Sequence, residues 1–521
     1  MPPETLRFHS PVSKLGSPED GQAIGRVLLK PLSYAVAHPA RSMTLWGLAM
    51  ALVATVVLLA ITPAIWPTQN ARREKMRDSM TVLEHGGPLL LGRHGPRGPF
   101  YAVDFGDDEG SFVYIPLLSR AFGVADPARM LRYMYVALVV LAVAFYPLVF
   151  YRLTGSLPAG LAAPAVLLVS VLSMGFVDIY WMAGWGALAL LPLIFLLACD
   201  WPRFGLFALA GISLVAGWLS SIRSFSGLGI VAAAMVVLLL RRWRWWRSLT
   251  ALAMLAVLYI SVNTFVLGAI RENRDHRLGS AAKTLDVTSK HTLWHNAYDG
   301  FGFLPNSFGI RTLDSVSLAR VEREAPGTRF LSGRYEAVIR GAYLRLLLDR
   351  PGEAIRQYSA KLIVAIADTS PWLLIVLLTL PIVLSLSAER RTARRWMLLS
   401  IPSGILAFLP VMVARPNLPY EQSLYGVLGL VGIMGVCLLI ALVEATIRER
   451  GGVAPTLAGM NVTLGSLLHS HAPGWRAIRL SVAGVVLLGA LAFGGYYVRR
   501  DADRWLGGSR TSGVLMEHVG G

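Results

Sequence analysis

The feature that most constrains this chain is a series of apolar segments, each long enough to cross a lipid bilayer. A membrane-spanning helix needs about 20 apolar residues, and about eleven segments of that kind follow one another in the sequence. They lie near residues 43–65, 130–151, 158–176, 182–199, 204–220, 225–240, 249–270, 360–386, 397–413, 422–445 and 477–497. The segments predict an all-α polytopic membrane protein with about eleven transmembrane helices.

The composition excludes a soluble protein. Of the 521 residues, 55% are hydrophobic and 15% are charged, whereas soluble domains carry about 25% charged residues. The net charge of +18 does not indicate nucleic acid as a partner, because Lys and Arg form short clusters between the apolar segments. There they act as topology signals and contacts for lipid headgroups. The two cysteines, Cys199 and Cys437, lie inside apolar segments and indicate neither a disulfide framework nor a zinc site.

Basic clusters in the short loops predict the orientation, because such clusters stay on the cytoplasmic side. RRWRWWR at 241–247, ERRTARR at 389–395 and IRER at 447–450 all face the cytoplasm if the N-terminus does. About forty polar and irregular residues precede the first segment, so that segment is expected to be an uncleaved anchor. Eleven spans then put the C-terminus outside.

This topology divides the chain into five parts. We expect a cytoplasmic segment at 1–42, a transmembrane core at 43–270 with a first external loop at 66–129, a large external loop at 271–359, further transmembrane helices at 360–497 and an external tail at 498–521. In the large loop, apolar residues recur at helical spacing with Arg on the other face, and Pro351 after Asp349 marks a break between two helices. Such a basic amphipathic helix can lie along the outer headgroups or cover the protein's own external domain.

Three consecutive acids, Asp107, Asp108 and Glu109, lie in the first external loop within GDDEGSFVY. Adjacent residues point in different directions on a helix or a strand, so the three carboxylates cannot all converge on one atom. One of them can take a proton from an attacking sugar hydroxyl or hold a divalent cation against a phosphate. Without further context, a solvated acidic turn explains these acids at least as well.

The arrangement resembles the GT-C superfamily of polytopic glycosyltransferases, which includes protein O-mannosyltransferases, lipid A aminoarabinose transferases and mycobacterial arabinofuranosyltransferases. The similarity rests on DDEGSFVY, and on the stretch from the Arg-led helix RMLRYMYV through YRLTG to AGLAAPAVLLVS. It covers about residues 43–240 and is architectural beyond them. The resemblance implies a cytoplasmic N-terminus, an acidic motif in the first external loop and a donor sugar carried on a polyprenyl phosphate.

Transferred position by position, the Asp-Glu motif of the superfamily falls on Asp108 and Glu109, so the resemblance implies that Asp108 is the general base. Asp107 is an additional acid that leaves the register open by one residue. A second acid often lies in the next external loop of these enzymes, and Asp178 offers one at the outer end of the third span. An acid there is costly unless it faces a cavity, a partner or water.

Two arginines are candidates for binding the phosphate of the donor. Arg223 and Arg415 each lie in a short external loop, where the charge rule does not predict them. Bidentate hydrogen bonding suits Arg to phosphate, although both side chains can instead extend to lipid headgroups. Lys361, at the outer start of the eighth span, is a weaker candidate.

The stretch from 290 to 315, KHTLWHNAYDGFGFLPNSFGIRTLDS, is a second candidate for substrate contact. Its aromatic rings can stack on a sugar and its polar groups can bind hydroxyls, although packing within the external loop is the rival interpretation. The residues selected here are His291, Trp294, His295, Tyr298 and Arg311.

The same stretch raises the question of a metal ion. His291 and His295 are four residues apart, which is the spacing of two metal ligands on one helix face. Residue 292 is Thr where the HExxH pattern has Glu, and no third ligand is in register. The sequence therefore argues against zinc, and a divalent cation is left open as a cofactor.

The sequence predicts an integral membrane glycosyltransferase that moves a sugar from a polyprenyl-phosphate donor to a hydroxyl of an envelope glycan, lipid or protein on the external face, with inversion at the anomeric carbon. Richness in Ala, Gly and Arg fits a bacterial inner membrane.

Two alternatives stay open. An enzyme similar to O-antigen ligases or polymerases would also use a lipid-linked glycan but rely on Arg and His, and a transporter or flippase of lipid-linked substrates would be expected to show paired interrupted helices.

Overall fold

The computed structural model describes residues 38–65, 70–93, 98–103, 108–175, 178–241, 243–279, 293–330, 332–385, 390–449 and 472–506. Regular structure in these ranges is helical except for one antiparallel hairpin, β1 (Leu91–Arg93) with β2 (Phe100–Ala102). Eight helices among the described residues are long and apolar enough to cross a membrane. The prediction of an all-α polytopic membrane protein is therefore confirmed.

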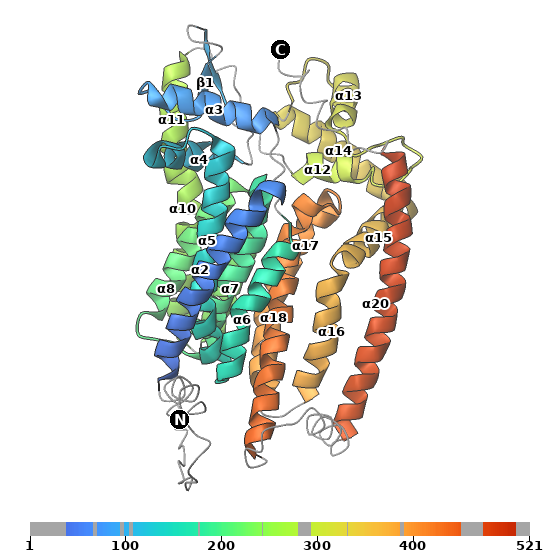
Figure 1. The fold of residues 1–521 in the computed structure, drawn as a ribbon. Coiled ribbons are helices and arrows are strands. Elements are labelled where there is room, and N and C mark those ends of the chain that lie inside the picture. Colours follow the sequence, from blue (N-terminus) through green and yellow to red (C-terminus); the bar gives the residue numbers. More distant parts are fainter. Residues whose placement is uncertain are drawn as a thin grey trace.

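A bundle of roughly parallel and antiparallel helices forms the body of the molecule (Figure 1). Its members are α2 (Pro39–Ile65), α5 (Pro127–Thr154), α6 (Leu157–Ser173), α7 (Trp181–Cys199), α8 (Gly205–Ile222), α9 (Leu228–Leu240), α10 (Trp245–Ser261), α16 (Ser370–Ser385), α17 (Arg390–Val413), α18 (Leu418–Glu449) and α20 (Ala472–Trp505). Helix α7 is buried along most of its length, whereas α2 and α20 expose apolar side chains such as Leu52 and Val486. Exposed aliphatic side chains on peripheral helices are what a lipid environment requires.

Small residues allow the central helices to approach closely. A Cβ atom at Gly184 of α7 would lie 2.5 Å from the carbonyl oxygen of Gln422, and one at Gly426 of α18 would lie 2.4 Å from the carbonyl oxygen of Gly184. Close crossings at small residues are typical of membrane helices. This crossing brings the start of α18 next to the start of α7, where Tyr420 and Tyr180 lie edge to face.

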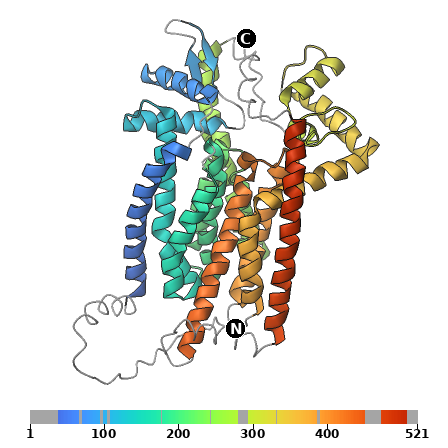
Figure 2. The ribbon, with the colours of Figure 1, turned by 45° about the vertical axis from the view of Figure 1, so that its right-hand side comes forward.

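A separate layer, which we call the headpiece, covers one end of the bundle (Figures 1 and 2). Its members are α3 (Asn70–Glu84), the hairpin, α4 (Glu109–Phe122), α11 (Leu267–Leu278), α12 (Leu293–Gly300), α13 (Asp314–Glu324) and α14 (Gly333–Asp349). Both views place α3, α4 and α11 on one side of the headpiece and α12, α13 and α14 on the other. The two predicted long loops therefore contribute most of this layer.

The break predicted at Pro351 is confirmed, because α14 ends at Asp349 and α15 (Pro351–Asp368) begins at that proline. Helix α14 buries Tyr335, Ile339 and Leu346 in a core that belongs to the headpiece, so it covers the protein's own domain. The segment expected as one span at 360–386 differs from the prediction. It forms α15 and α16, which meet at an angle of 72°.

Hydrogen bonds show which helix ends lie at each end of the bundle. Arg132 at the headpiece end donates to the carbonyl oxygen of Leu59 near the end of α2, and the Trp505 indole donates to Gly302 in the headpiece at 3.3 Å. Helices α2 and α20 thus both end on the headpiece side. Arg241 donates to the carbonyl oxygen of Leu197 at 2.7 Å, at the opposite end of α7.

Candidate active site

The carboxylate of Asp108 is buried at the boundary between the headpiece and the bundle. Asp108 precedes the first turn of α4, and its backbone carbonyl accepts from the N–H of Ser111 at 2.9 Å and the hydroxyl of Ser111 at 2.7 Å. Its side chain does not cap the helix and is 2% exposed. Arg72 donates to one carboxylate oxygen at 2.7 Å, and Arg223 donates to the other at 2.6 Å.

Asp178 lies on the far side of Arg72, with 3.3 Å between its carboxylate and the Arg72 Nε atom. It begins the short 3-10 helix η1 (Asp178–Tyr180) with a φ of +46°. That backbone conformation is uncommon outside Gly, although Asp tolerates it better than most residues. Strained residues of this kind concentrate at functional sites. We call Arg72, Asp108, Asp178 and Arg223 the Asp-Arg cluster.

The charges of the Asp-Arg cluster stabilise one another. Burial alone would lower the pKa of Arg72, but Asp108 and Asp178 outweigh burial and raise that pKa above its ordinary value. Arg223 lies over the ring of Tyr180 at 4.4 Å and that of Phe225 at 5.0 Å. Buried charges are tolerated when they are paired and hydrogen-bonded, so the site keeps two cations and two acids together.

A glycine allows α4 to reach α8. A Cβ atom at Gly110 would lie 2.6 Å from the carbonyl carbon and the carbonyl oxygen of Ser221, which is closer than any real contact. Because Ser221 is two residues before Arg223, this contact fixes the distance between Asp108 and its second guanidinium group. A larger residue in place of Gly110, the Gly of the DEG sequence, would therefore not fit between α4 and α8.

Glu109 points away from Asp108 and pairs with a different arginine. Its carboxylate is 3% exposed and accepts from the Arg271 Nε atom at 2.7 and 2.8 Å, with a further contact to Nη2. The prediction that these acids do not converge is confirmed for Asp108 and Glu109, and a solvated turn is excluded for both. Asp107 lies outside the described residues.

A polar cavity of about 280 Å³ lies beside Glu109 and Arg271. It is lined by Glu109, Ser220, Ser221, Ser224, Tyr259, Ile260, Asn263, Thr264, Leu267 and Arg271. Asn263 and Thr264 belong to a single π-helical turn, η2 (Val262–Val266), between α10 and α11. Such turns often occur at functional sites. Apolar side chains on the outer face of this helix, including Ile260 and Phe265, are exposed, so the cavity borders a surface suited to lipid.

The other two charged candidates, Arg415 and Lys361, lie outside the Asp-Arg cluster. Arg415 is half-buried in the turn between α17 and α18. Lys361 is fully buried and donates to the carbonyl oxygens of Met412 at 2.7 Å and Val413 at 3.3 Å. Its described contacts join α15 to α17.

The candidates between 290 and 315 are not brought to Asp108. Figures 1 and 2 place α12 and α4 on different sides of the headpiece. Trp294 and Tyr298 pack into the headpiece core, His295 is buried there, and Arg311 lies 4.7 Å from the ring of Trp505. Packing within the headpiece therefore accounts for Tyr298. His291 lies outside the described residues.

Sequence reasoning missed two arginines of the site, Arg72 and Arg271. Arg72 lies in a long loop, and long loops are excluded from the charge rule. Arg271 directly follows the segment predicted at 249–270, at its external end. Unlike Arg223 it belongs to a long loop, but its position directly beside the external end of a span is a signal that could have identified it.

Comparisons with protein-family models, with curated proteins and with solved structures each found no match. The geometry itself supplies a buried carboxylate held by two guanidinium groups, next to a polar cavity that also contains a carboxylate and an arginine. Guanidinium groups bind phosphate oxygens, and a carboxylate can act as a general base.

Proposed function

We propose that this protein is a membrane glycosyltransferase of the GT-C type, which transfers a sugar from a polyprenyl-phosphate donor to an acceptor hydroxyl on the headpiece side. The observation that carries the proposal is the buried Asp-Arg cluster next to a polar cavity bordered by apolar, exposed helix faces. Transfer from a lipid-linked sugar phosphate needs an apolar surface for the lipid chain, cations for the phosphate and a base for the acceptor hydroxyl. The exposed helix faces, the arginines and Asp108 supply these three features.

The donor phosphate occupies the cavity and competes with Asp108 for Arg223. Both oxygens of Asp108 are engaged by guanidinium groups, so the carboxylate can take a proton only after one guanidinium has moved. Arg223 turns to the phosphate, while Asp178 keeps Arg72 in place. Donor binding therefore releases the base at the moment when it is needed.

The reaction is then a single displacement. The freed oxygen of Asp108 removes the proton of the acceptor hydroxyl, whose oxygen attacks the anomeric carbon as the bond to the lipid phosphate breaks. Arg223 and Arg271 balance the charge of the departing phosphate, which is electrostatic stabilisation of the transition state. Attack opposite the leaving group inverts the anomeric carbon. Asp107 stays the alternative base, and a divalent cation remains an optional aid to the leaving phosphate.

The finer architecture belongs to this proposal. Helices α6 and α9 are apolar but short, and α15 and α16 form one bent pair. Counting these three with the eight longer helices gives eleven transmembrane passages, the N-terminus in the cytoplasm and the headpiece outside. We assign the protein to a bacterial inner membrane, with an envelope glycan, lipid or protein as the acceptor.

Transfer from radiolabelled polyprenyl-phosphate sugars tests the function. Membranes containing the wild-type protein, Asp108→Asn, Asp107→Asn or Asp200→Asn are compared at equal protein levels. We expect Asp108→Asn to lower transfer by about 10²–10⁴-fold, the usual contribution of a general base. Asp200→Asn, an exposed acid at the opposite end of α7, is the matched control and keeps full transfer.

Three outcomes would change the account. Loss at Asp107→Asn alone moves the base by one residue. Full transfer by both Asp108→Asn and Asp107→Asn contradicts general-base catalysis from this loop. No transfer by the wild-type protein from a panel of hexosyl, pentosyl and aminosugar donors contradicts the proposed function.

A further inference from the structure

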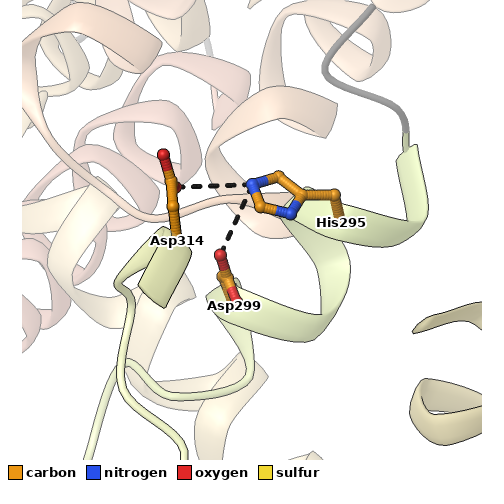
Figure 3. A group of neighbouring side chains, drawn as sticks. All are labelled: His295, Asp299 and Asp314. Atoms are coloured by element: carbon orange, nitrogen blue, oxygen red, sulfur yellow. Dashed lines mark ion pairs between the residues drawn. The ribbon is translucent and has the colours of Figure 1, made fainter. Parts of the chain in front are cut away.

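A second cluster of ionisable side chains lies in the headpiece, on α12 and α13 (Figure 3). His295, Asp299 and Asp314 each direct one ligand atom toward the others, and these atoms lie within 4.8 Å of one another. The cluster is on the side of the headpiece away from α4. The cluster is therefore separate from the site of the proposed transferase reaction.

Two hydroxyl groups lie next to the Nδ1 atom of His295, which leaves Nε2 to face the carboxylates. The Ser317 hydroxyl donates to Asp299, at 2.8 and 2.9 Å from its two oxygens. Its single hydrogen is thereby used, so Ser317 can only accept at the His295 Nδ1 atom, which is 3.3 Å away. The Tyr335 hydroxyl is 2.9 Å from the same nitrogen and can either donate to it or accept from it. When the hydrogen of the neutral ring lies on Nδ1, the Nε2 atom presents its lone pair to the two carboxylates.

The Nε2 atom of His295 faces both carboxylates at distances that suit a shared metal ion. It lies 3.5 Å from an Asp299 oxygen and 3.4 Å from an Asp314 oxygen. Metal ligands at about 2.0–2.1 Å in a tetrahedron are themselves about 3.4 Å apart. The observed separations match the metal arrangement.

We propose that His295, Asp299 and Asp314 bind a zinc ion through Nε2 and one oxygen of each carboxylate. The mixed nitrogen and oxygen set suits Zn²⁺ better than Mg²⁺, which prefers six oxygen ligands. Tyr335 hydrogen-bonds to the second nitrogen of His295, and Ser317 hydrogen-bonds to the Asp299 carboxylate. Hydrogen bonds of this kind orient the ligands of metal sites.

The site has one side open to solvent. His295 is 1% and Asp299 is 5% exposed, whereas the side chain of Asp314 is 42% exposed. Three protein ligands leave the fourth position of a tetrahedral ion for water or an anionic ligand. The ion would join α12 to α13, and through Tyr335 to α14, so zinc binding stabilises this half of the headpiece.

The sequence argued against zinc because no third ligand stands in the HExxH register. Asp299 lies one turn after His295, and Asp314 is the first residue of the next helix. The turn between the helices brings Asp314 back to the histidine. That return is a tertiary contact that ligand spacing along one helix does not reveal.

Zinc content of the purified full-length protein tests the proposal. The protein is purified in detergent through a tag without histidine, exposed to ZnCl₂, desalted and measured by inductively coupled plasma mass spectrometry. We expect about one zinc ion per chain, with displacement of a zinc-binding dye as a second readout. His295→Ala and Asp314→Asn should each bind at least about tenfold less zinc. His276→Ala, which removes an exposed histidine on α11, should bind as the wild type does.

A residue that acts through the ligands provides a finer test. Ser317→Ala should keep the ion but weaken zinc affinity by about 10–100-fold, the usual effect of removing such a partner. Asp314 is partly exposed, so Asp314→Asn separates loss of zinc from loss of folding. Less than about a tenth of an ion per chain in the wild type, or equal zinc in His295→Ala and the wild type, would overturn the proposal.

Discussion

At the scale of single residues, charge balance determines which substitutions the Asp-Arg cluster tolerates. Removal of one partner from a buried ion pair leaves an uncompensated charge and costs about 3–5 kcal/mol. Arg223 does more than supply charge, because its planar group lies over Tyr180 and Phe225 while it donates to Asp108. Lys retains the charge but can neither stack in that way nor donate in a bidentate fashion.

Replacement of Arg223 by Lys separates these two contributions. We expect Arg223→Lys to lower the turnover of sugar transfer by about 10²–10³-fold, the effect of removing one donor that stabilises transition-state charge. The protein should still fold, because a cation is kept next to Asp108. Turnover is measured with a saturating donor, and Arg203→Lys, an exposed arginine at the opposite end of the bundle, is the matched control. Wild-type turnover in Arg223→Lys would contradict the role of Arg223.

A half-buried acid in the headpiece, Glu336, makes stability depend on pH. Neither carboxylate oxygen of Glu336 has a hydrogen-bond partner in the described part of the chain, and burial raises the pKa of Glu336 from 4.5 to about 7. Between those values the folded protein holds a proton that the unfolded chain has released, so the free energy of unfolding falls as pH rises through this window. Above pH 7 the loss is complete.

Glu336→Gln should remove this dependence. We expect the variant to be more stable than the wild type at pH 8 by about 1 kcal/mol, after allowance for the partial exposure of the residue. Near pH 5 the two proteins should unfold at similar temperatures. Thermal unfolding in detergent from pH 5 to pH 8 measures the effect, with Glu272→Gln on the exposed face of α11 as the control. Parallel pH profiles for the wild type and Glu336→Gln would show that Glu336 is not the cause of the pH dependence of stability.

Individual site residues were predictable where they broke a local rule. Asp178 and Arg223 are charges at the ends of apolar segments, and such positions are rare, whereas Asp108 was selected through the acidic motif of the GT-C superfamily. Their gathering around Arg72 was not predictable, because Arg72 lies in a long polar loop among other arginines. Arg72, and not another arginine of that loop, reaches Asp108 because of how α3 packs on the bundle.

At the scale of elements, the site depends on how closely α4 lies against α8. Gly110→Ala would force α4 away from Ser221, since the new methyl group overlaps the backbone there. We expect a loss of about 1–3 kcal/mol in stability, the usual cost of overpacking, and weaker transfer because Asp108 moves away from Arg223.

The control for this substitution is Gly211→Ala, in the helix α8 against which α4 packs, where a Cβ atom meets nothing within 4 Å. It should leave both properties unchanged, because surface substitutions of this kind stay within about 0.5 kcal/mol. Thermal unfolding and transfer are measured for both variants. Equal behaviour of the two would show that the contact of α4 with α8 does not matter.

The elements were predictable to different degrees. Apolar length is a local property, and each predicted segment falls on an apolar helix. The bend between α15 and α16 had a local signal that the prediction of a single span at 360–386 did not use, because Pro371 stands at the start of α16, two residues after Thr369. The three-residue strands β1 and β2 are too short to carry a sequence pattern.

At the scale of the whole molecule, the account requires the headpiece to face outward. Cys199 is exposed at the end of the bundle opposite the headpiece, and Ser307 is exposed in the headpiece. A membrane-impermeant maleimide applied to right-side-out vesicles should label Ser307→Cys in a Cys199→Ala background. It should label the native Cys199 only after the membrane is opened. The reverse pattern would contradict the orientation and place the Asp-Arg cluster on the cytoplasmic side.

The central claim is that a polyprenyl-phosphate donor binds in the cavity beside the Glu109–Arg271 pair, next to Asp108. Photo-crosslinking with a polyprenyl phosphate that carries a diazirine near its phosphate tests this placement most directly. The account predicts labelled peptides from 220–224 and 259–271, with labelling reduced by excess unlabelled polyprenyl phosphate and by Arg271→Gln. Labelling confined to α12, α13 and α14, or unaffected by the competitor, would contradict the claim.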